Sequence, residues 1–169
     1  MTTQAVAANV PEGLMKLAGW CAYISGGVSV IGIVFLGLMF AGWERFGPMN
    51  DVTIIFQYIL VLPIVITVWM ILRPQGNPLN TPMLVLGLAA MVAVIVLQVL
   101  LVTGVLPFER QVYMVTAAFV VGIVWYVATG QMARTLGVLP RSVPLQVLAG
   151  FYVGYPVWVF KFGQMMLGG

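Results

Sequence analysis

Few residues in this chain carry side chains that could do chemistry. Histidine is absent, the acids are Glu12, Glu44, Asp51 and Glu109, and the single thiol is Cys21. Without histidine there is no imidazole to ligate a haem, to bind a metal ion or to act as a general base near neutral pH. The acids all fall outside the long apolar runs or at their ends. We therefore predict a protein that is not an enzyme and that holds no cofactor and no metal.

Among the uncharged polar residues inside the apolar runs are Gln57, Thr67 and Gln98. Such side chains could line a polar path or a pocket for a solute. A structural role is the alternative, because threonine can donate a hydrogen bond to its own helix backbone and glutamine can bridge neighbouring helices. Both interpretations stay open at the level of the sequence.

The composition identifies the kind of element that must position these side chains. Hydrophobic residues make up 62% of the 169 residues and charged residues only 7%, whereas soluble domains carry about 25% charged residues. This balance is typical of an integral membrane protein. The net charge of +3 comes from Lys and Arg scattered along the chain, so it forms no basic patch for nucleic acid.

Five apolar runs are long enough to cross a membrane, since a hydrocarbon core of ~30 Å needs ~20 helical residues. They lack the alternating pattern of β-strands, and a helix satisfies all of its own backbone groups in lipid. We predict an all-α bundle that forms one transmembrane domain over residues 1–169. Its spans are 17–40, 52–72, 83–106, 112–132 and 145–166. Thr81, which precedes Pro82, is predicted to cap the third span.

Small residues spaced four apart predict where helices touch, because close packing drives helix association in lipid. The first span carries Ala22 and Gly26, and the last carries a GxxxG pair, Gly150 and Gly154. These faces could pack within the chain or against a partner. Cys21 is interpreted as another small packing residue, and Pro63 predicts a kink in the second span.

Aromatic residues near the ends of the spans predict interfacial belts, where amphipathic rings sit at the level of the lipid headgroups. The belt residues are Trp20, Trp43, Trp69, Trp125, Trp158, Tyr113 and Tyr126. Lys161 lies roughly 24 Å along the last span at about 1.5 Å per residue, near the edge of the hydrocarbon core. A lysine there can snorkel to water. We predict an anchor that contacts lipid phosphate or a nearby carboxylate.

Orientation follows from the Lys and Arg residues of the short loops. Five spans put Lys16, Arg73, Arg134 and Arg141 on one side, against Arg45, Arg110 and Lys161 on the other. The more basic side is expected to be cytoplasmic. The N-terminus is therefore predicted inside and the C-terminus outside.

Three stretches carry a resemblance to a known group of proteins. They are LAGWCAYISGG, GPMNDVTIIFQYILVLPIVITVW and RTLGVLPRSVPLQVLAG. In these stretches the chain resembles small multi-pass bacterial membrane proteins classed under domains of unknown function. The resemblance implies a bacterial inner membrane protein and brings no activity or site residues with it.

Two classes of function are compatible with these observations. The first is an accessory or scaffold subunit that contacts membrane lipids and docks to other membrane protein subunits through its small-residue faces. The second is a small transporter or a membrane protein that binds a hydrophobic ligand. A cavity at mid-membrane lined by Gln57, Thr67 and Gln98 would favour the second class, and a filled core would favour the first.

Overall fold

The computed structural model describes residues 10–73, 79–135, 163, 164 and 167. This part of the chain forms four long helices: α2 (Glu12–Phe40), α3 (Phe46–Leu72), α4 (Asn80–Val102) and α5 (Phe108–Thr135). Each is long and apolar enough to cross a membrane. The predicted all-α, multi-pass membrane fold is thus confirmed. The described residues hold four such helices and not five, because the predicted span 145–166 lies outside them apart from Gly163 and Gln164.

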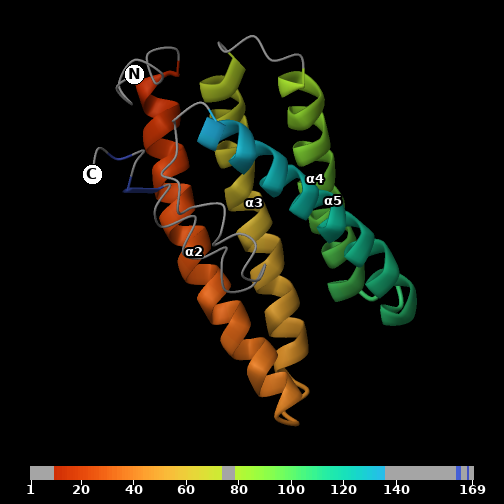
Figure 1. Cartoon of the computed structure of the whole chain (residues 1–169). Coiled ribbons are helices and arrows are strands. Elements are labelled where there is room, and N and C mark those ends of the chain that lie inside the picture. The colour runs from red at the N-terminus through yellow and green to blue at the C-terminus, as the bar shows by residue number, and fades with distance from the viewer. Residues whose placement is uncertain (1–9, 74–78, 136–162, 165–166, 168–169) are drawn as a thin grey trace.

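Successive helices run in opposite directions and pack in chain order (Figure 1). α3 packs between α2 and α4, whereas α5 packs along α4, crosses it obliquely and touches α3 only briefly. We call the end at which α2 begins and α3 ends the N-face. The opposite end, with the turns at 41–45 and 103–107, is the turn face. α2, α3 and α4 form a row, and α5 lies obliquely across α4 and α3.

Both turns on the turn face depend on a glycine in the left-handed region. Gly42 has a φ of 95° and Gly104 a φ of 73°. The amide of Trp43 donates to the carbonyl of Leu38 at 3.1 Å, and the amide of Val105 donates to that of Leu100 at 2.9 Å. This is the hydrogen-bond pattern of the Schellman motif, which ends a helix and satisfies its last carbonyls. The two hairpins are therefore closed tightly.

α2 buries a stripe that consists only of small residues. They are Ala18, Gly19, Cys21, Ala22, Ser25, Gly26, Ser29 and Gly32. Small residues let two helix backbones approach closely, which supplies much of the affinity between helices in lipid. At Gly32 an added Cβ would lie only 2.9 Å from Thr53 Oγ1 of α3. The buried position of Cys21 agrees with its predicted packing role.

The large side chains of the core come mostly from α3 and α4. Val61, Ile64 and Val65 of α3 are at most 1% exposed and belong to one cluster with Met91 and Val94 of α4. The helix continues through Pro63, although proline cannot donate the usual hydrogen bond. These residues fill the middle of the molecule.

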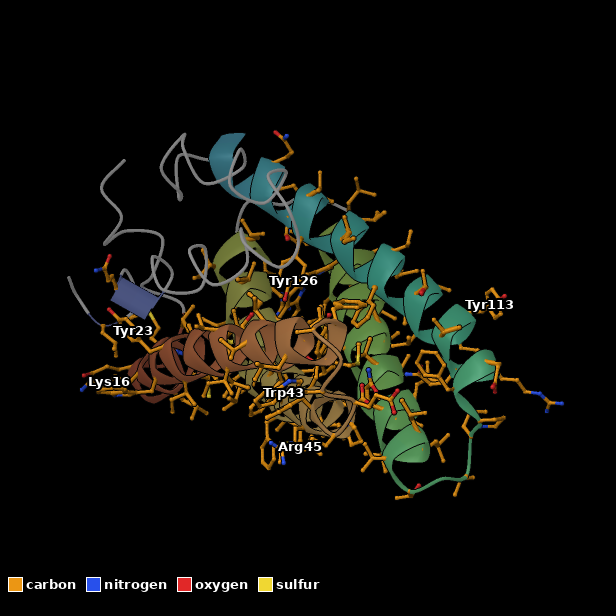
Figure 2. All side chains as sticks on the ribbon, turned by 90° about the horizontal axis from the view of Figure 1, so that it is seen from below. Lys16, Tyr23, Trp43, Arg45, Tyr113 and Tyr126 are labelled. Atoms are coloured by element: carbon orange, nitrogen blue, oxygen red, sulfur yellow. The ribbon has the colours of Figure 1, made fainter. Side chains whose placement is uncertain are left out.

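The predicted interfacial belts are correct only in part. Trp20 is exposed, and Trp43 is exposed on the turn face, where the Arg45 guanidinium lies 5.4 Å from its ring centroid (Figure 2). On α5 the prediction holds for Tyr113, which points away from the bundle, and fails for Tyr126, which points inward. It also fails for Trp125, which is 2% exposed.

Trp125 is buried because α4 offers a glycine at the point of contact. A Cβ at Gly87 would lie 2.6 Å from Trp125 Nε1, so the indole rests directly on the α4 backbone. The pairing depends on how α5 crosses α4, and position along a span does not reveal it.

Candidate functional site

Residues that could carry chemistry are few and dispersed in the described structure. Across residues 10–73 and 79–135, no three His, Cys, Asp or Glu side chains come together in a way that could hold a metal ion. Glu12 pairs with Lys16 at 2.6 Å at the exposed start of α2. Glu44 and Glu109 are exposed at the turn face. Asp51 is half-buried in the second turn of α3. This carboxylate and the buried uncharged polar groups are therefore the remaining candidates for binding.

The structure does not bring Gln57, Thr67 and Gln98 together at one site. Thr67 is fully buried, and its hydroxyl donates to the carbonyl of Pro63 at 2.8 Å. Gln57 is half-buried ten residues earlier on α3, which corresponds to about 15 Å along the helix. Gln98 lies on α4 near the turn face. The predicted polar lining is thus divided between separate places.

Two buried glutamines, Gln98 and Gln111, lie in the α4–α5 hairpin. They are 3% and 2% exposed, respectively. Gln98 Oε1 and Gln111 Nε2 have no hydrogen-bond partner. The two residues lie at similar depth, because Gln98 is four residues from the end of α4 and Gln111 is three from the start of α5. An acceptor and a donor are therefore both unsatisfied within one hairpin.

A small polar cavity lies between α2, α3 and α5 in the half of α3 next to the turn face. This Asn50 cavity has a volume of about 20 Å³. Its lining consists of Ser29, Gly32, Ile33, Asn50, Thr53, Ile54, Gln57, Tyr58 and Phe119. The Thr53 hydroxyl donates to the Asn50 carbonyl at 2.7 Å. A volume of this size holds about one or two water molecules.

A second cavity lies between α3, α4 and α5 next to the N-face. This Asn80 cavity has a volume of about 10 Å³. Its lining consists of Val65, Val68, Trp69, Leu72, Asn80, Met83, Leu84, Trp125, Thr129 and Met132. Asn80 Nδ2 donates to the carbonyl of Leu72 at 2.7 Å, which satisfies a carbonyl at the end of α3. Asn80 Oδ1 and Trp69 Nε1 have no partner.

The predicted cap of α4 is replaced by a different arrangement. Thr81 is exposed and lies inside the helix, which begins at Asn80. Asn80 is 5% exposed and uses its side chain on the preceding helix. A polar residue just before Thr-Pro is a normal helix-start signal, so the sequence shows the boundary but not which backbone group the side chain satisfies.

Apolar side chains separate the two cavities along α3. Val61, Ile64 and Val65 are almost completely buried between Gln57 and Thr67. We call these three residues the apolar plug. Between Tyr58 and Thr67, over about 12 Å of helix, every α3 side chain is apolar and offers no polar group to a passing solute.

The residues predicted to meet a partner divide into two groups. Ala22 and Gly26 are buried within this chain as part of the α2 stripe, so they serve internal packing. Gly150, Gly154 and Lys161 lie outside the described residues. Their roles as a docking pair and an anchor remain predictions.

Several buried polar residues were missed by sequence reasoning because the predicted spans begin too late. Asn50 and Gln111 each lie within two residues of a predicted start, at 52 and 112, and were counted as loop residues. The observed helices begin at 46 and 108.

Comparison of the chain with models of protein families, with curated proteins and with solved structures finds no match.

Proposed function

We propose that this chain is a non-catalytic accessory or scaffold subunit of a larger membrane protein assembly in a bacterial inner membrane. The observation that carries the proposal is the apolar plug. A transporter needs polar groups or hydrated space at the middle of the membrane. Here Val61, Ile64 and Val65 fill that level of α3, and the cavities on either side are about the size of one or two water molecules.

The outward surface of the described helices supports the same proposal. α2 turns its small residues inward and leaves large apolar side chains exposed, among them Leu17, Ile24, Ile31 and Val34. Such a surface suits lipid or the apolar helix of a partner. With Ala22 and Gly26 used internally, the GxxxG pair Gly150 and Gly154 is the proposed docking face.

The test begins with extraction of the native membrane in mild detergent. The chain, of 18.3 kDa, is expected to migrate as part of a larger assembly. Gly154→Leu is expected to insert normally, because leucine is favourable in lipid, and to be released from that assembly. Gly37→Leu is the matched control, since a Cβ at Gly37 meets nothing within 4 Å. A variant at Gly154 that stays bound would contradict the proposed docking face.

The Asn50 cavity favours one alternative, a small transporter or a protein that binds a hydrophobic ligand. Its lining contains Gln57, as that alternative requires. If the purified chain were a monomer that moved a solute across liposomes, the scaffold proposal would be wrong. Liposomes without protein provide the baseline for such a measurement.

The proposed orientation places the N-terminus inside and, with five spans, the C-terminus outside. One contact bears on the proposed fifth span. A Cβ at Gly163 would lie 3.1 Å from the carbonyl oxygen of Gly19, which is about 10 Å from the start of α2 at about 1.5 Å per residue. A fifth crossing from the N-face would put Gly163 near the turn face. The contact therefore disagrees with the position of Gly163 that five spans predict.

A further inference from the structure

The Asn80 cavity combines a buried donor and a buried acceptor that lack partners. Trp69 Nε1 is a donor only, and Asn80 Oδ1 is an acceptor. Both are buried, neither has a hydrogen-bond partner, and both residues line the same cavity. A buried polar group without a partner costs about 1–3 kcal/mol. Two complementary groups of this kind around one small space indicate a missing polar occupant.

The orientation of the asparagine amide is fixed by the fold. Its Nδ2 must face the carbonyl of Leu72, to which it donates at 2.7 Å, because a carbonyl oxygen can only accept. The amide oxygen is therefore the atom left without a partner. Thr129 adds another acceptor to the lining, since its hydroxyl proton is donated to the carbonyl of Trp125 at 2.7 Å and its oxygen lone pairs remain.

The size of the space selects the occupant. The cavity measures about 10 Å³, which is close to the minimum for one water molecule, and buried waters make about three hydrogen bonds. We propose that the Asn80 cavity binds a single water molecule that accepts from Trp69 Nε1 and donates to Asn80 Oδ1 and Thr129 Oγ1. This water joins α3, α4 and α5 next to the N-face. The inference does not depend on the proposed function.

The water determines whether removal of the Trp69 indole N–H destabilises the folded chain or not. If the indole N–H donates to water, its removal loses a hydrogen bond. If the cavity is dry, removal abolishes an unsatisfied donor and is neutral or stabilising. The substitution should keep the ring size, so that no new cavity confuses the result. Benzothienylalanine meets this need because sulfur replaces the N–H group.

We would incorporate benzothienylalanine at position 69 of the full chain and measure reversible unfolding in mixed micelles. The expected result is a shift of the unfolding equilibrium toward the unfolded state by about three- to tenfold, the loss of one hydrogen bond. The same replacement at Trp20, which is 60% exposed, is the matched control and should change little. An unchanged or stabilised chain at position 69 would overturn the proposal.

A direct measurement identifies the occupant. The indole proton of Trp69 can be assigned in a ¹⁵N-labelled sample by its loss in Trp69→Phe. It is expected to show cross-relaxation with a long-lived water molecule. A proton that shows no water contact, whether it is bonded to another protein group or unpaired, would overturn the proposal.

Discussion

Trp125 and Gly87 show how one residue pair sets the packing of two helices. The indole of Trp125 rests on the α4 backbone because Gly87 has no side chain. Buried aromatic rings contribute much apolar contact in a core, and here that contribution depends on a single missing methyl group. The nearby pair of Gly122 and Met91 is looser, with a Cβ at Gly122 3.8 Å from Met91 Cε.

We predict that Gly87→Ala destabilises the chain by about 1–3 kcal/mol, the usual cost of overpacking a core. The added Cβ would be 2.6 Å from Trp125 Nε1, so the ring or the helix must move. Unfolding in mixed micelles measures the effect, and Trp125 fluorescence reports the movement. Gly122→Ala is the control on the same interface and should cause no loss. Equal stability of both variants would show that Trp125 can shift freely.

At Gln98 we predict a substitution that does not lower stability, in contrast to Gly87→Ala. Its Oε1 is buried without a partner, and such a group costs about 1–3 kcal/mol. Gln98→Met keeps a similar volume and removes the polar atoms, so the variant is expected to be as stable as the original chain or more stable. Thermal unfolding in detergent checks this. A clear loss of stability would indicate that Gln98 is paired in the membrane, with Gln111 the nearest candidate at similar depth.

At the scale of the helix, the sequence predicts four elements well and their ends poorly. Long apolar runs identify α2 to α5 because each reaches the length and hydropathy of a membrane-spanning helix. The starts of α3 and α4 are missed because Asn50 and Asn80 are polar and yet buried. Small-residue spacing predicts a contact face of α2 at Ala22 and Gly26 but does not say whether the contact is internal or with a partner. Trp125 and Tyr126 are misplaced because their burial depends on which helix lies opposite.

The α2–α3 interface gives an element-scale prediction. Gly32→Leu is expected to separate the two helices, because even a Cβ at this position would lie 2.9 Å from Thr53 Oγ1, and to cost about 1–3 kcal/mol or more. Gly27→Leu is the matched control, since a Cβ there meets nothing within 4 Å. Detergent unfolding compares the two variants, and both should insert normally. If only Gly27→Leu lost stability, the face of α2 that packs on α3 would be the one with Gly27, and the assignment of Gly32 to that interface would be wrong.

At the scale of the whole molecule, the alternating helices define which loops share a side. Positions 43 and 105 lie in turns on the turn face, and the ends of α3 and α4 lie on the N-face. The basic residues of the described helix ends and turns, Lys16, Arg73 and Arg134 toward the N-face against Arg45 and Arg110 toward the turn face, give only a weak bias in orientation. An experiment on the intact chain must decide it.

We predict that cytoplasmic reporters fused after position 76 are active and that those fused after positions 43 and 105 are inactive. A fusion at Gly169 tests on which side of the membrane the C-terminus lies. Inactivity there is expected from the proposed five spans, whereas activity would show that the chain ends on the same side as position 76. A reporter active only on exported protein, fused at the same positions, is the control and should give the complementary pattern.

The apolar plug has an electrical consequence. The Asn50 and Asn80 cavities lie along the two halves of α3, with Val61 and Ile64 between them and Val65 at the edge of the Asn80 cavity. An ion entering this layer would lose its hydration with no group to replace it, at a cost of several kcal/mol or more. This apolar layer covers about 12 Å of α3, between Tyr58 and Thr67. The buried amides and hydroxyls of this chain thus lie on either side of the layer without forming a continuous polar path along α3.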